Sequence, residues 1–181
     1  MTEVAIREAV AAESVVARAA SGDQVAFARL VDQHHASMAR VAYAITGDAE
    51  AADDCVQTAW SIAWRRIPKL RDHDAVGAWL VAIAANEARQ ALRRLRRRPV
   101  VDISSVAEPA GGGDPADRIE TVDLARVLSR LNPDERTLLA LRFVGGLDSA
   151  AVAQHLGLSA SGVRSRLSRL VERLRAELNH A

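Results

Sequence analysis

The sequence predicts an all-α protein built from two small helical domains. Alanine, the strongest helix former, occupies 36 of 181 positions, while aromatic residues make up only 3%. Apolar residues recur at spacings of three and four along most of the chain. The stretch 99–120 interrupts this pattern with three prolines, three consecutive glycines and a net charge of −4. We therefore expect domains at 1–98 and 121–181, joined by an acidic flexible linker at 99–120.

Three helices are expected in the first domain, each preceded by an aspartate that can cap its N-terminus and followed by glycine or proline. The apolar stripe of the first helix is long and continuous, which makes it the clearest of the three. The expected helices run from the Ser21-Gly22-Asp23 cap to Gly47, from Ala49, capped by Asp48, to Ile67 before Pro68, and from a cap at Asp72 or Asp74 to about Arg98 before Pro99.

Four helices are expected in the second domain. A Gly157-Leu158-Ser159 turn separates the last two, and a short helix, a glycine-containing turn and a longer helix are typical of a helix-turn-helix. An Asn132-Pro133 pair, favourable as N-cap and first helical residue, precedes the second of the four. Their expected ranges are Val122 to Leu131, Asp134 to Val144, Ser149 to Leu156, and Ala160 to about Leu178.

The last helix carries a basic, serine-containing face opposite its apolar stripe. Residues 162–175 hold five arginines and one glutamate, a local charge of +4. Arginine pairs with guanine edges or phosphates, and serine bonds to phosphate or base, so this helix suits a DNA major groove. The alternative is an ordinary solvated basic face. The candidate DNA-contacting residues are Arg164, Ser165, Ser168 and Arg169.

The third helix of the first domain ends in an arginine-rich run, because residues 86–98 hold six arginines and one glutamate. So many like charges repel one another unless a polyanion neutralises them. Upstream, Trp79 could stack on an unpaired base and Asn86 could hydrogen-bond to one. Taken alone, Trp79 fits a core position better than a stacking platform.

The second helix presents a polar row formed by Asp54, Gln57 and Ser61. An acidic and amide row suits a basic partner protein, and a solvated face is the equal alternative. Asp53 and Asp54 are adjacent, which disfavours a catalytic carboxylate pair.

Composition and motif spacing exclude several other classes of function. The formal net charge is +1, so DNA binding must come from local clusters. A single cysteine, Cys55, excludes an internal disulfide framework and a Cys-cluster zinc site. The adjacent His34 and His35 cannot share a metal as an i, i+4 pair does. Without an 18-residue apolar run, a signal peptide or a nucleophile–base motif, we expect a cytoplasmic non-enzyme with no cofactor, metal or small-molecule substrate.

Two sets of motifs resemble those of bacterial RNA polymerase sigma factors of the sigma-70 family. Asp54-x-x-Gln57-x-x-Trp60-x-x-x-Trp64, then Trp79-Leu80-x-x-Ile83-Ala84-x-Asn86 and the arginine-rich helix end, resemble region 2. Leu131-Asn-Pro-Asp-Glu-Arg136, Leu156-Gly157-Leu158-Ser159 and Val163-Arg-Ser-Arg-Leu167 resemble region 4. Their order and the chain length are similar to the extracytoplasmic-function (ECF, group 4) class, over roughly Ala17 to Leu178.

The resemblance implies a dissociable factor that gives core RNA polymerase promoter recognition and strand opening. Its implied partners are the β′ clamp helices and β flap of the polymerase, promoter DNA and an anti-sigma factor, and the linker would thread towards the RNA path. The implied residue roles are core binding by Asp54, Gln57 and Ser61; capture of single-stranded −10 DNA by Trp79 and Asn86 with the loop Lys69 to Ala75; phosphate binding by Arg89, Arg93 and Arg94; and −35 duplex reading by Arg164, Ser165, Ser168 and Arg169.

Three positions depart from the family pattern and leave the promoter sequence open. Gln90 stands where aspartate is common, Ala151 replaces a frequent glutamate, and Gly162 replaces a frequent threonine. Two other functions compete with this interpretation. A stand-alone helix-turn-helix regulator would bind palindromic duplex as a dimer, and an all-α enzyme or metal module would use the region around His34.

Overall fold

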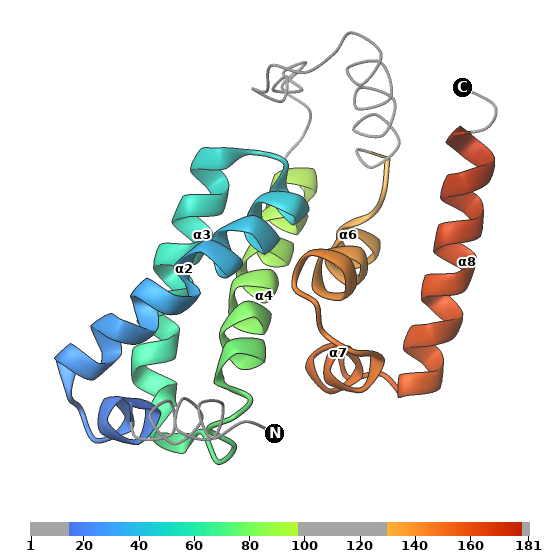
Figure 1. Ribbon diagram of the computed structural model, residues 1–181. Helices are drawn as coiled ribbons and strands as arrows, with labels where there is room; N and C mark the ends of the chain where they lie inside the picture. Colours follow the sequence, from blue (N-terminus) through green and yellow to red (C-terminus); the bar gives the residue numbers. More distant parts are fainter. Residues whose placement is uncertain (1–14, 98–129, 179–181) are drawn as a thin grey trace, which may run out of the picture.

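The computed structural model describes residues 15–97 and 130–178, and every regular element in these two ranges is helical (Figure 1). The predicted all-α class is therefore confirmed for the described part of the chain. The predicted linker at 99–120 and nearly all of the predicted helix Val122 to Leu131 lie outside the described residues. A helical turn at 15–20 precedes the labelled elements, which are α2 (Gln24–Thr46), α3 (Ala49–Arg66), η1 (Ile67–Lys69), α4 (Val76–Arg97), α6 (Pro133–Leu139), η2 (Ala140–Val144), α7 (Ser149–Leu156) and α8 (Ala160–Leu178).

Capping residues set the limits of α2 and α3 as the sequence predicts. The Asp23 carboxylate accepts hydrogen bonds from the backbone N–H groups of Val25 and Ala26 at the start of α2. At its end, Gly47 adopts a left-handed conformation, with φ of 73°, and donates its N–H to the Tyr43 carbonyl. Asp48 then caps α3 through the Ala51 N–H.

The first domain packs α2, α3 and α4 around one apolar core. Its largest fully buried side chains come from α2, η1 and α4, while alanines fill the close approaches between helices. Pro68 lies within the single 3₁₀ turn of η1, so the regular α-helix ends at Arg66 and Ile67 is buried just beyond it. The fully buried members of this core include Leu30, Met38, Val41, Ile45, Val56, Ile67 and Leu80.

The second domain differs from the sequence prediction in one element. A continuous helix from Asp134 to Val144 was expected, but α6 changes at Ala140 into a π-helical turn. The Gly145 N–H donates to the Ala140 carbonyl at 2.8 Å, which is the five-residue spacing of that turn. This wider turn ends the element, and α7 begins at Ser149 after the Asp148 cap.

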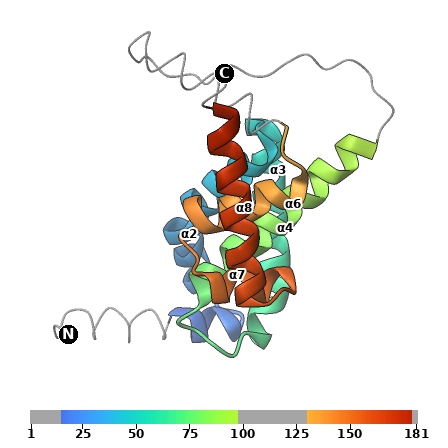
Figure 2. The ribbon, with the colours of Figure 1, turned by 90° about the vertical axis from the view of Figure 1, so that its right-hand side faces the viewer.

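The two domains pack directly on each other. The elements α6 and η2 lie against α2 and α4, and α8 lies beyond α6 and α7 on the side away from the first domain (Figures 1 and 2). The buried apolar residues of both domains form one continuous cluster, which includes Leu80 of α4 and Leu141 of η2. This packing sets which of the predicted functional side chains are exposed.

Candidate nucleic-acid interface

The helix-turn-helix places α8 with its predicted DNA-contacting face outwards. Its apolar stripe packs inwards, and all four predicted contact residues are exposed. The Ser168 hydroxyl donates to Glu172 at 3.0 Å and Arg169 Nε donates to the Ser165 carbonyl at 3.3 Å, so two of the four make local contacts within the helix. The buried residues opposite them are Val163, Leu167, Leu170 and Leu174.

The turn between α7 and α8 gives a local reason for one departure from the family pattern. Gly157 adopts the left-handed conformation, with φ of 66°, that this sharp turn requires. Ser159 Oγ then accepts the Gly162 N–H at 3.0 Å at the start of α8. A Cβ at position 162 would also lie 3.0 Å from Ser159 Oγ, so a larger residue would require this hydroxyl to shift slightly.

The predicted partner row on α3 is fully on the surface. Asp54, Gln57 and Ser61 are all exposed, and the Ser61 hydroxyl donates to the Gln57 carbonyl. Trp64, one turn further along, is also partly exposed, at 36%. The helix packs against α2 and α4 and lies on the side of the first domain away from α6.

An aromatic cluster that is not predicted from the sequence supports this end of α3. The Phe27 ring makes edge-to-face contacts with Trp60 and Trp64, at centroid distances of 5.6 and 4.9 Å. Trp60 Nε1 donates to His35 Nδ1 at 3.4 Å. The only sequence signal was the placing of both tryptophans beside the apolar stripe.

The predicted −10 residues on α4 have unequal surroundings. Trp79 is half-buried and packs against the core, whereas Asn86 and Arg94 are exposed. Arg89 and Arg93 instead face the second domain, where both pair with Asp134 in the first turn of α6. The sequence predicts that the arginine run is open to DNA, and no local pattern in it indicates this carboxylate.

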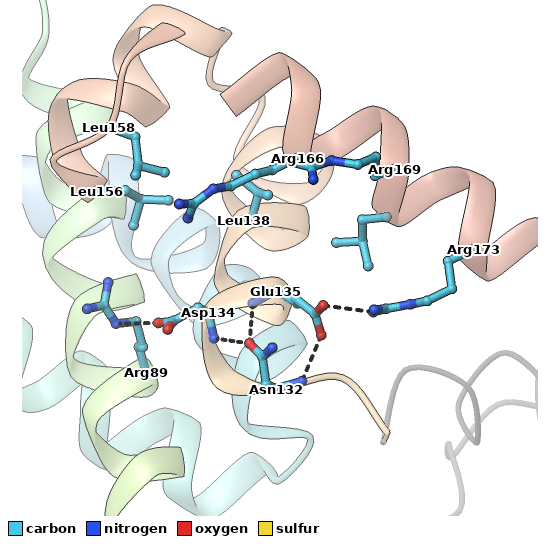
Figure 3. Close-up of a pocket in the computed structure, with 11 residues that line it drawn as sticks. Arg89, Asn132, Asp134, Glu135, Leu138, Leu156, Leu158, Arg166, Arg169 and Arg173 are labelled. Carbon is cyan, nitrogen blue, oxygen red and sulfur yellow. Dashed lines mark hydrogen bonds and ion pairs between the residues drawn. The ribbon is translucent and has the colours of Figure 1, made fainter. Parts of the chain in front are cut away.

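A cavity of about 600 Å³ lies between α4, α6, α7 and α8 (Figure 3). Two adjacent acids on its wall have different partners. Asp134 pairs with α4, whereas Glu135 accepts from Arg173 of α8 at 2.8 Å and from the Asn132 N–H at 3.1 Å. The lining residues are Arg89, Asn132, Asp134, Glu135, Leu138, Leu156, Leu158, Arg166, Arg169, Leu170 and Arg173.

Burial shifts the pKa of one histidine in each domain. His34 lines a second cavity, of about 430 Å³, between α2, α4 and the segment 145–151 that leads from η2 into α7, and burial lowers its pKa below the usual value. Burial likewise lowers the pKa of His155 in α7.

Within the described ranges, no group of three histidine, cysteine or acidic side chains is placed to hold a metal, and no described helix has the length and apolarity needed to cross a membrane.

Comparison with known proteins identifies the family. Residues 30–98 match Sigma-70 region 2, and residues 121–174 match Sigma-70, region 4. The ECF RNA polymerase sigma factor SigM of Mycobacterium tuberculosis is 32% identical over 155 residues, which cover 85% of this chain and 78% of SigM. This chain is a sigma factor of the ECF group. It belongs to a family of transcription initiation factors that direct RNA polymerase to promoters.

Other relatives agree with this family. The probable RNA polymerase sigma factor RfaY of Xanthomonas campestris is 36% identical over 170 residues, and the chain spans only 42% of the length of that relative. The solved structure of CnrH in complex with the cytosolic domain of CnrY matches this sigma factor with a TM-score of 0.69 and 30% identity, over 93% of this chain and 97% of CnrH. A second structure, the sigma factor RpoE with the anti-sigma factor NepR from Bartonella quintana, is 21% identical with a TM-score of 0.67 and supports the fold.

Proposed function

We propose that this sigma factor binds core RNA polymerase through α3, captures single-stranded −10 DNA with α4, and reads the −35 duplex with α8. The observation that carries the proposal is the exposure of two separate polar surfaces, on α3 and on α8, in a chain of the sigma-70 family. Because the two surfaces lie on different domains, polymerase and duplex DNA can be bound at the same time.

The proposal for α8 rests on its shape and charge. Arg164, Ser165 and Ser168 project from the N-terminal half of a helix that follows a sharp turn, as recognition helices do. Arginine can pair in a bidentate manner with guanine, and serine can accept or donate to either base or phosphate. The departures Gly162 and Ala151 change neighbouring positions, so they alter which sequence is read rather than whether DNA is bound.

The proposal for α4 rests on three kinds of side chain that follow one another along the helix: an aromatic ring, an amide and a group of arginines. Trp79, near its start, offers an aromatic ring that is only partly buried, and Asn86, two turns later, is exposed. Arg89, Arg93 and Arg94 follow and supply the positive charge that a phosphate backbone requires. Stacking, base hydrogen bonding and phosphate neutralisation are the three needs of single-stranded DNA binding.

The proposal for α3 rests on exposure and charge. An acidic and amide row, with Trp64 continuing the same surface, fits a basic helical partner such as the β′ clamp helices. We assign the second domain to the β flap. We also propose an anti-sigma partner, because the related CnrH is found in complex with the cytosolic domain of CnrY, and RpoE in complex with the anti-sigma factor NepR.

We propose further that the chain has no catalytic activity of its own and acts in the cytoplasm, where RNA polymerase acts. A sigma factor contributes recognition and strand opening, while the polymerase forms the phosphodiester bonds. Its function then needs no nucleophile, metal or cofactor. The alternatives of a stand-alone regulator or a metal module at His34 are not favoured, since both sets of sigma motifs occur in order.

The deciding experiment is run-off transcription with sigma-free core polymerase and promoter fragments from the source genome. We expect transcription only when this sigma factor is added, and loss of it when both Arg164 and Arg169 are replaced by alanine. Arg175→Ala is the matched control, because it removes the same charge from the exposed last turn of α8. Failure to open any promoter of that genome would overturn the proposal.

A further inference from the structure

One acidic side chain of the second domain holds two of the arginines that we assign to −10 DNA. Arg93 Nη2 donates to both carboxylate oxygens of Asp134, at 2.7 Å each. Arg89 Nε lies 3.1 Å from Asp134 Oδ1 in an ion pair (Figure 3), although its N–H is not aligned for a hydrogen bond. One carboxylate thus occupies the arginine pair from the other side of the domain boundary.

We propose that Asp134 is an internal substitute for a DNA phosphate, and that it keeps Arg89 and Arg93 of the −10 surface occupied until the two domains separate. The proposal rests on the −10 role given to α4 above. A carboxylate and a phosphate offer arginine the same paired oxygen acceptors, so they compete for the same guanidinium groups. DNA phosphate and Asp134 compete for Arg93 Nη2.

The surrounding contacts make this closed arrangement a packed interface rather than a single surface ion pair. Arg136 Nη1 donates to the Ile45 carbonyl at 3.1 Å and so satisfies a backbone acceptor in the last turn of α2. On the other side, a Cβ added at Gly145 would come within 3.0 Å of Val81 Cγ1 of α4, so the two domains approach closely there. The Asp134 contacts therefore sit at the edge of a close-fitting surface.

The closure is selective, because the other two proposed surfaces stay exposed. Asp54, Gln57 and Ser61 of α3 are exposed, and so are the predicted −35 residues of α8, of which only Arg169 lines the cavity that Arg89 and Asp134 border. The closed chain can therefore reach core polymerase before it can reach single-stranded DNA. We infer that the polymerase opens the molecule by holding the two domains at separate sites.

The Asp134 side chain is 56% exposed and that of Arg93 is 42% exposed. Solvent and salt reach such a pair, so the ion pair is of moderate strength and the closed arrangement of the two domains is reversible. When the closed state predominates, the apparent association constant for DNA equals the intrinsic one multiplied by the fraction of molecules that are open. Removing the Asp134 charge should therefore increase affinity without any new contact to DNA.

The test uses the full chain and a fluorescein-labelled single-stranded oligonucleotide of mixed sequence, with binding followed by anisotropy. We expect Asp134→Asn to bind about tenfold more tightly than the unaltered protein, because more molecules are open. Asp32→Asn, which removes the same charge from an exposed position on α2, should leave binding unchanged. Asp134→Ser, also compatible with the first turn of α6, should reproduce the gain if the asparagine variant folds poorly.

Two further measurements distinguish closure by Asp134 from a non-specific effect of charge on DNA binding, and from the proposed −10 role of α4. Small-angle X-ray scattering should give a larger radius of gyration for Asp134→Asn than for Asp32→Asn, and the gain in DNA binding should disappear in the holoenzyme. Equal radii of gyration and equal DNA affinities for the two variants would overturn the proposal that Asp134 keeps the domains closed. Arg94→Ala, on α4 but outside the Arg89–Arg93 pair, tests the −10 role separately, because unchanged DNA binding by this variant would contradict that role. The scattering measurement would still decide whether Asp134 keeps the domains closed.

Discussion

Two arginine-bearing helices of this sigma factor have opposite environments. On α8 the residues Arg164 and Arg169 are exposed, and the helix lies on the outside of the second domain, although Arg169 also lines the cavity that Arg89 borders. On α4 the residues Arg89 and Arg93 face the second domain and pair with Asp134. The two helices carry similar local charge, so charge content alone does not tell which surface is available. A partner carboxylate supplied by the fold makes the difference.

The comparison also gives the two surfaces different dependences on conformation. Because the α8 face is exposed in the closed molecule, its DNA affinity should not depend on domain separation. The α4 face should depend on it strongly, since the same guanidinium groups serve as the closing contact. A chain of two tethered domains can thus keep one binding surface permanently available and restrict the other.

The largest effect should come from the core that both helices share. Leu141 is 1% exposed and lies in η2, which packs against α2 and α4. Leu141→Ala should lower the free energy of unfolding by about 2–5 kcal/mol, because it leaves a cavity where the two domains meet. Urea denaturation measures the loss. The neighbouring Phe143, which is 63% exposed, provides the control, and an equal loss for Phe143→Ala would contradict this description of the junction.

The next effect concerns α8 alone. Arg164→Ala and Arg169→Ala should each weaken binding of the holoenzyme to −35 duplex by about 1–3 kcal/mol, because each removes a base or phosphate contact. Competition binding with promoter fragments gives the values. Since Arg164 does not line the cavity that contains Asp134, the loss for Arg164→Ala should be the same in an Asp134→Asn background. A loss of affinity that changes in that background would contradict the statement that the α8 surface is available in the closed molecule.

A smaller effect is expected on α3, which is exposed like α8 but binds protein rather than DNA. The double change Asp54→Ala with Gln57→Ala should weaken binding to core polymerase by about 1–2 kcal/mol while leaving thermal unfolding unchanged, because both side chains lie on the surface. Asp53→Ala is the control on the same helix. Normal co-purification of the double variant with polymerase would remove α3 from the proposed interface.

The smallest effect is a dependence on pH. Burial lowers the pKa of His34 and of His155 in the folded state, so the unfolded chain binds more protons as pH falls below about 6.5. Stability should therefore be complete above that value and decline as the solution is acidified. His34→Gln, at the domain junction, and His155→Gln, in the helix-turn-helix, should each reduce the loss in free energy of unfolding as the pH falls. Denaturation curves at pH 7 and pH 5 compare the two, with His73→Gln as control.

Helix limits were predictable from sequence because their causes are local. Asp23, Asp48 and Asn132 cap helices within three residues of themselves, and Gly47 and Gly157 end them in the same manner. The exposed faces of α3 and α8 followed from a period of 3.6 residues. The π-turn at 140–144 was missed, because an apolar stripe continues through it and the periodicity does not separate it from an α-helix.

The pairing of arginines on α4 could not be predicted in this way. Asp134 lies 41 residues from Arg93 along the chain, and nothing in the local pattern of either segment specifies the other. A signal did exist, since acidic residues at the start of α6 stand opposite in charge to the end of α4, but many acids in this chain offer the same opposite charge. Long-range contact depends on which apolar faces pack together.

By itself, the sequence determined the helices, their caps, their polar faces and the membership in the sigma family, because these follow from short-range periodicity and from motifs of fixed spacing. The tertiary structure alone decided which arginines are free and which are held. That choice depends on the close packing of α6 and η2 on α2 and α4, where a carboxylate reaches a guanidinium only after two distant apolar faces have met.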